Sequence, residues 1–164
     1  MKASQRVRVG ETSSHISIIL VTLAQLIFFT RFHKYIAWNF TEPDGSITRL
    51  SMLTDDYFTW LPIMITGSII VILSSIVMII YNEYKFTRTI QIGFNIIGIV
   101  ISVSLIYIYP FDFSVIPSTT AVDVAPILVT GFFILLAVFY ATASVFMFIR
   151  IRNYSIRQNR QNSD

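Results

Sequence analysis

Four long runs of apolar residues, separated by short polar segments, organise this chain. The last run is the clearest, because the 26 residues between Asp123 and Arg150 include no Asp, Glu, Lys, Arg or His. A helix needs about 20 consecutive apolar residues to cross the hydrocarbon core of a bilayer. This run is long enough to span a membrane with some tilt, so the other apolar runs are interpreted in the same solvent.

Three further runs have the same character. Residues 12–30 contain no Asp, Glu, Lys or Arg, and the same holds for residues 57–82 and 89–111. The pattern predicts an all-α membrane protein whose fold is a four-transmembrane-helix bundle. We place the four spans at about residues 15–37, 56–82, 89–109 and 124–149.

The first run follows a basic start, which is also typical of a cleaved signal peptide. No small-x-small cleavage site follows the run, because the next residues are Arg31-Phe32-His33-Lys34-Tyr35. We therefore predict an uncleaved span. The chain then divides into a segment of residues 1–14, a transmembrane domain of residues 15–149, and a basic tail of residues 150–164 that we expect to be disordered beyond its first turns.

The two loops on one side of the spans are residues 38–55 and 110–123. In the first loop, Pro43-Asp44-Gly45 favours a turn, because Pro fixes φ and Gly accepts a positive φ. The residues on both sides of this turn partly alternate in polarity. We expect a short, extracytoplasmic β-hairpin-like loop between the first two helices.

The distribution of basic residues predicts the orientation. Nine of the 12 Lys and Arg residues lie in the N-terminal segment, the turn of residues 82–89 and the C-terminal tail, which all fall on one side. Basic residues concentrate on the cytoplasmic side of membrane proteins. We predict a multi-pass protein of the plasma membrane with both termini in the cytoplasm.

The composition excludes several classes of function. Only 13% of the residues are charged, about half the share of a soluble domain, and the net charge is +3. The basic residues flank apolar runs, which favours a topological role over nucleic-acid binding. The chain has no cysteine, which excludes disulfides, thiolate metal sites and cysteine nucleophiles.

Small and polar residues at helical spacing mark the faces through which membrane helices pack. The candidate interhelical contacts are Gln25, Ser75, Asn95 and Ser102. Gln25 and Asn95 are the two amides at the greatest depth, where a hydrogen bond between helices stabilises by about 1 kcal/mol. The alternative interpretation of these amides is a substrate-binding site.

The ionisable residues give little support to catalysis or coupled transport. The middle of every run lacks the ionisable group that proton- or cation-coupled transport usually needs. The two histidines, His15 and His33, would lie about 27 Å apart along a helix, too far to share a metal or a haem. We predict a non-enzymatic protein without cofactor or metal.

Seven ionisable residues are predicted to share the outer face of the membrane. We expect them to cap helices and to form surface ion pairs worth about 0–1 kcal/mol each, with Asp123 as the N-cap of the fourth helix. The alternative is a hydrated vestibule, or a site for a cation or a protein partner. This outer-face cluster comprises Arg31, His33, Lys34, Asp55, Asp56, Asp112 and Asp123.

The four spans and a longer first outer loop bracketed by Trp38 and Trp60 are similar in outline to claudin-like tetraspan proteins. The chain lacks the loop cysteines and the Gly-Leu-Trp motif of that family, so the similarity is one of architecture alone.

The sequence favours a small integral membrane protein that acts through protein–protein contact, as an accessory subunit or a homo-oligomer. Its expected partners are the lipid bilayer and a protein, and not nucleic acid. The alternative is a transporter or channel component whose polar path is lined by Gln25, Asn95 and the outer-face acids.

Overall fold

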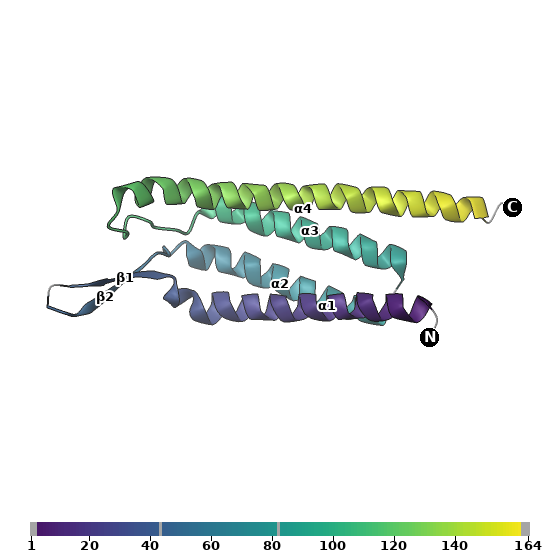
Figure 1. Ribbon diagram of the computed structural model, residues 1–164, viewed down its shortest axis with the longest axis horizontal. Helices are drawn as coiled ribbons and strands as arrows, with labels where there is room; N and C mark the ends of the chain where they lie inside the picture. The colour runs from purple at the N-terminus through teal and green to yellow at the C-terminus, as the bar shows by residue number, and fades with distance from the viewer. Residues whose placement is uncertain (1–2, 43, 82, 162–164) are drawn as a thin grey trace.

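The computed structural model describes residues 3–42, 44–81 and 83–161. Four long helices run along the molecule, and a two-stranded hairpin projects from one end, which we call the hairpin end (Figure 1). All four helices are long and apolar enough to cross a membrane, which confirms the helical part of the prediction. The helices are α1 (Ala3–Ile27), α2 (Tyr57–Ile80), α3 (Tyr84–Ile108) and α4 (Thr119–Gln161).

The helices extend further than the apolar runs do. Residues 3–14, expected to be a separate polar segment, belong to α1, and the tail that we expected to be disordered continues α4 as far as Gln161. A helix ends where a residue cannot continue its hydrogen-bond ladder, and α4 meets no proline after Pro126. Lack of charge therefore located the apolar part of each helix but not the helix ends.

The first span ends in two irregular turns. A π-helical turn at Phe28–Phe32 follows α1, and a 3-10 turn at His33–Tyr35 follows it. The Thr30 hydroxyl donates a hydrogen bond to the carbonyl oxygen of Leu26 at 2.7 Å. These turns lead the chain directly into the first strand.

The expected hairpin is confirmed. Strands β1 (Ala37–Thr41) and β2 (Ile47–Ser51) pair in antiparallel register, with Ala37 opposite Ser51. Gly45 occupies the turn with a φ of +83°, the left-handed conformation that glycine adopts without strain. Pro43 of the predicted turn and Asn82 of the predicted second span lie outside the described residues.

The second loop pairs with the chain that leaves the hairpin. The backbone nitrogen of Asp112 donates to the Met52 oxygen at 2.9 Å, and that of Thr54 donates to the Pro110 oxygen at 3.1 Å. Leu53 and Phe111 form a β-bridge between these two bonds. The two loops therefore form one connected layer at the hairpin end.

The prediction that Asp123 caps the fourth helix was wrong. Helix α4 begins four residues earlier, at Thr119, and the Ser118 hydroxyl accepts a hydrogen bond from the backbone nitrogen of Ala121 at 3.4 Å. Serine is a preferred N-cap, and the Ser118 carbonyl oxygen also accepts the first helical hydrogen bond, from the Val122 backbone nitrogen at 3.1 Å. Asp123 consequently lies inside the helix.

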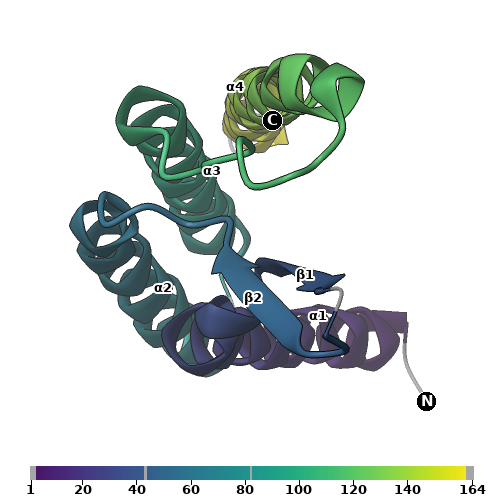
Figure 2. The ribbon, with the colours of Figure 1, turned by 90° about the vertical axis from the view of Figure 1, so that its left-hand side faces the viewer.

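The four helices form an open arc rather than a closed ring. α1 packs on α2, α2 on α3 and α3 on α4, with no comparable contact between α1 and α4. Figure 2, a view from the hairpin end, shows the arc with the hairpin in front of its open side. Both the start of α1 and the end of α4 lie at the opposite end of the molecule, the terminal end (Figure 1).

The hydrophobic core lies near the hairpin end, where α1, α2 and α3 meet. Tyr57, Trp60, Met64 and Leu105 are buried there, and Phe29 of the π-turn packs against them. The Tyr57 hydroxyl donates a hydrogen bond to the Phe29 carbonyl oxygen, and Trp60 Nε1 donates to the Ile101 carbonyl oxygen at 3.4 Å. This core holds the first three helices together.

Candidate functional site

The inner side of the arc carries a groove of about 390 Å³ to which all four helices contribute. Its walls include Phe29 of the π-turn after α1, Val71 of α2 and Phe133 of α4. Polar side chains lie among these apolar walls. We call this cavity the α1–α4 groove and define it by its polar residues Thr22, Gln25, Ser68, Asn95 and Ser102.

The two deep amides, Gln25 and Asn95, both line the α1–α4 groove. No hydrogen bond joins them. Asn95 is 9% exposed, and its Nδ2 lies 3.9 Å from the sulfur of Met147, a weak acceptor. The Gln25 side chain is exposed on the wall of the groove and makes no hydrogen bond within the described part of the chain.

The two candidate serines bond to their own helices. Ser75 is fully buried and donates to the Val71 carbonyl oxygen at 2.8 Å, while Ser102 donates to the Gly98 carbonyl oxygen at 2.8 Å. Their hydroxyls are satisfied four residues back, a common arrangement for serine in helices. Ser102 still lines the groove, whereas Ser75 does not.

Tyr140 of α4 lines the groove, although the sequence analysis did not select it. Its ring packs so closely on α3 that a Cβ added to Gly98 would lie 2.7 Å from the ring atom Cε2. A small residue such as Gly98 is typical of a position where membrane helices pack closely. The sequence did not indicate which helix would supply the ring.

The α1–α4 groove opens sideways rather than along the molecule. Toward the hairpin end, the buried side chains of Trp60 and Leu105 fill the space between the helices. Toward the terminal end, His15, Met78 and Thr87 are buried. The remaining side is the one between α1 and α4, which the arc leaves open.

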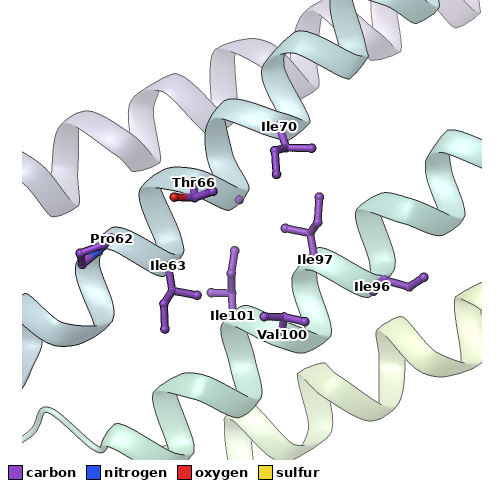
Figure 3. A pocket seen from close by; sticks show the side chains of 9 residues that line it. Pro62, Ile63, Thr66, Ile70, Ile96, Ile97, Val100 and Ile101 are labelled. Atoms are coloured by element: carbon purple, nitrogen blue, oxygen red, sulfur yellow. The ribbon is translucent and has the colours of Figure 1, made fainter.

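A second cavity lies between α2 and α3 and is almost entirely apolar. It measures about 420 Å³, and Figure 3 shows Ile63 and Ile70 of α2 facing Ile97 and Ile101 of α3. Thr66 contributes the only side-chain polar group among its lining residues. The cavity has the character of a lipid-chain contact and lacks the convergent polar groups of a specific site.

The outer-face cluster is only partly assembled. His33, Lys34 and Asp55 line a third cavity of about 370 Å³ beside the hairpin, together with Arg49, which the sequence analysis did not include. None of the predicted ion pairs forms among the described residues. Arg31 lies in the π-turn, Asp56 precedes α2 without forming a side-chain cap, and Asp123 lies in α4.

The remaining acid of that cluster, Asp112, stabilises its own loop. Its Oδ1 accepts hydrogen bonds from the hydroxyl of Ser114 at 2.6 Å and from the Ser114 backbone nitrogen at 2.9 Å. These bonds, the hydroxyl bond foremost, hold the pKa of the Asp112 carboxyl below its usual value. The Asp112 carboxylate therefore stabilises the turn of its own loop.

Within the described residues, no three His, Asp or Glu side chains come close enough together to hold a metal ion. The sequence matches no family model, no curated protein and no solved structure. The groove whose lining residues come from all four helices is therefore the candidate functional site.

Proposed function

We propose that this protein is a multi-pass protein of the plasma membrane that acts without catalysis, through contact with another protein as an accessory subunit or in a homo-oligomer. Four helices of sufficient length and hydropathy support the membrane assignment. The excess of basic residues at the terminal end supports cytoplasmic termini and a hairpin outside the cell.

The observation that carries this proposal is the unpaired amide of Gln25. Gln25 lies near the middle of the candidate span Thr12–Tyr35, exposed on the open side of the arc and without a hydrogen-bond partner among the described residues. An amide in hydrocarbon without a partner costs several kcal/mol, because no water is there to bond it. A polar side chain from a partner's transmembrane helix would remove this cost.

The shape of the groove favours a partner that arrives from within the membrane. Buried side chains close both ends of the groove, so access is lateral, between α1 and α4. Apolar residues of α4, such as Phe133 and Leu136, line the groove together with the amides and offer a packing surface. A helix seated there would gain close packing and a hydrogen bond together.

The test places a photo-crosslinking amino acid at position 25 and, in a separate variant, at position 135. Leu135 is 70% exposed on α4 but does not line the groove. In cells, we expect a discrete protein adduct from position 25 and none from position 135. The adduct is then tested for a second copy of this chain carrying a different tag, which separates the oligomer from the accessory subunit.

A substitution makes the same test quantitative. Gln25→Leu should lower co-purification of the cross-linked partner about fivefold, the equivalent of one membrane hydrogen bond of about 1 kcal/mol. Gln91→Leu makes the same chemical change outside the groove, where Gln91 Oε1 accepts a hydrogen bond from Arg88 Nη1. This control variant should leave co-purification unchanged. Equal losses in both variants, or no adduct at position 25, would contradict the proposal.

The alternative function, a transporter or channel component, is favoured by the fact that both deep amides line one cavity. A path across the membrane would need the closed ends of the groove to open. The Gln25→Leu, Asn95→Leu double variant, reconstituted in liposomes, separates the two functions. A loss of solute or ion flux without a change in assembly would establish transport in place of partner binding.

A further inference from the structure

The cavity beside the hairpin is separate from the α1–α4 groove. It measures about 370 Å³ and lies where the turn after α1, strand β2 and the start of α2 meet. The two cavities have no described lining residue in common. We call it the hairpin pocket and define it by the residues His33, Lys34, Arg49, Thr54 and Asp55.

Two positively charged residues, Lys34 and Arg49, line the hairpin pocket, and their charged groups both contact the ring of Tyr35 beside it. The guanidinium carbon of Arg49 lies 4.7 Å from the centre of the Tyr35 ring, and Lys34 Nζ lies 5.4 Å from the same centre. Neither forms an ion pair within the described residues, although Asp55 lines the same pocket. Like charges repel, and contact with one aromatic ring offsets only part of that repulsion.

The hairpin pocket also contains polar atoms that the fold does not use. His33 Nδ1 and Thr54 Oγ1 are shielded from solvent and make no hydrogen bond with the described part of the protein. The His33 ring is held in place by stacking on Tyr57, with ring centres 5.3 Å apart. Buried polar atoms without partners are rare in folded proteins, so a hydrogen-bonding group bound beside them would remove an unfavourable feature of the fold.

We propose that the hairpin pocket binds a phosphoryl group that carries one negative charge, such as the phosphodiester of an anionic phospholipid or of a soluble molecule. The planar fork of Arg49 and the point charge of Lys34 are the side chains that proteins use for phosphate. Asp55 offsets one of these two charges, which favours a monoanion over a dianion. Phe58, which is 58% exposed, lines the pocket and offers an apolar contact for an attached chain.

The experiment uses the full-length protein in neutral detergent and measures bound phosphatidylglycerol and phosphatidylcholine by native mass spectrometry. We expect a preference for phosphatidylglycerol that Lys34→Gln and Arg49→Gln each weaken about fivefold. Asp55→Asn should strengthen it, because it removes the opposing charge. Arg31→Gln is the matched control, since it removes a positive charge from the same end of the molecule but outside the pocket.

Soluble glycerophosphoglycerol, the phosphodiester headgroup of phosphatidylglycerol without its acyl chains, serves as competitor and separates the two sources of the phosphoryl group. Displacement of phosphatidylglycerol only at a large molar excess identifies the lipid, whereas displacement at equal concentration identifies a soluble phosphodiester. Circular dichroism and gel filtration confirm that each variant is folded, and Arg49→Lys should restore part of the binding. Equal binding of the two lipids, or equal weakening by Arg31→Gln and Arg49→Gln, would overturn the proposal. These outcomes do not depend on the partner proposed for the α1–α4 groove.

Discussion

The contact between Gly98 and Tyr140 sets the distance between α3 and α4. A methyl group at position 98 would lie within 2.9 Å of three atoms of the Tyr140 ring. Real side chains do not tolerate such a separation, so the ring would have to move toward the α1–α4 groove or the helices would have to separate. One missing methyl group therefore permits the close packing of the two helices.

Gly98→Ala should lower the free energy of unfolding by about 1–3 kcal/mol, the usual cost of an overpacked contact. Gly93→Ala on the same helix is the control, because a Cβ there meets no atom within 4 Å. That control should leave stability unchanged or raise it by up to about 1 kcal/mol, since alanine favours helix over glycine. Thermal unfolding in detergent measures both variants, and equal shifts would contradict the proposed contact.

At the scale of single residues, the sequence indicated which positions could face other helices, but not the hydrogen-bond partners of their side chains. Gln25 and Asn95, selected by their depth in the apolar runs, both line one cavity. Whether two amides bond depends on the separation of their helices. The Ser102 hydroxyl is satisfied by a carbonyl oxygen of its own helix. A serine in such a position therefore does not indicate a hydrogen bond to another helix.

At the scale of elements, the hairpin depends on one left-handed residue. Gly45 has a φ of +83°, and Asp44 Oδ1 accepts hydrogen bonds from the Ser46 hydroxyl at 2.7 Å and from its backbone nitrogen at 2.9 Å. A residue with a Cβ in this conformation costs about 1–2 kcal/mol. The turn was predictable because both residues favour turns in any sequence. Asp accepts a hydrogen bond from the backbone two residues on, and Gly adopts a positive φ without strain.

Gly45→Ala should therefore open the hairpin more often. We expect trypsin to cleave after Arg49 on β2 about fivefold faster or more, the rate change that corresponds to about 1 kcal/mol of local opening. Cleavage after Arg88, in α3 and distant from the turn, is the control within the same molecule. Equal cleavage after Arg49 in the variant and the original chain would show that the turn conformation does not limit opening.

The ends of the helices were less predictable than their existence. An uncharged run shows where a chain can lie in hydrocarbon, but a helix continues until its hydrogen-bond ladder is interrupted. Ser118 caps the start of α4, and an uncharged cap leaves no mark on the pattern of charge along the chain. The predicted start at Asp123 followed the charge boundary instead.

At the scale of the whole molecule, the arc is the feature that the sequence could not predict. In water, an open arc would close to bury its apolar inner face, but lipid offers little such driving force. The candidate interhelical contacts were expected to face other helices, although nothing in the sequence required α1 and α4 to meet. In a membrane, this weak driving force would account for both the open side of the arc and the unpaired amide of Gln25.

The orientation can be tested with the chain itself, because it contains no cysteine. A Ser46→Cys variant carries its only thiol at the exposed hairpin turn, and an Asn153→Cys variant carries its only thiol at the exposed end of α4. With both termini in the cytoplasm, an impermeant maleimide should label intact cells through position 46 alone. Position 153 should react only after permeabilisation. The reverse pattern would establish the opposite orientation.

The length of α4 gives the molecule a mechanical property. Its 43 residues make a helix of about 65 Å, roughly twice the thickness of the hydrocarbon core. The same unbroken rod that forms one wall of the α1–α4 groove through Phe133 and Tyr140 extends past the start of α3 at the terminal end (Figure 1). Its contacts with α3 are spread from Tyr140 through Met147 to Tyr154, so the rod is braced along the length of α3 and not at a single point.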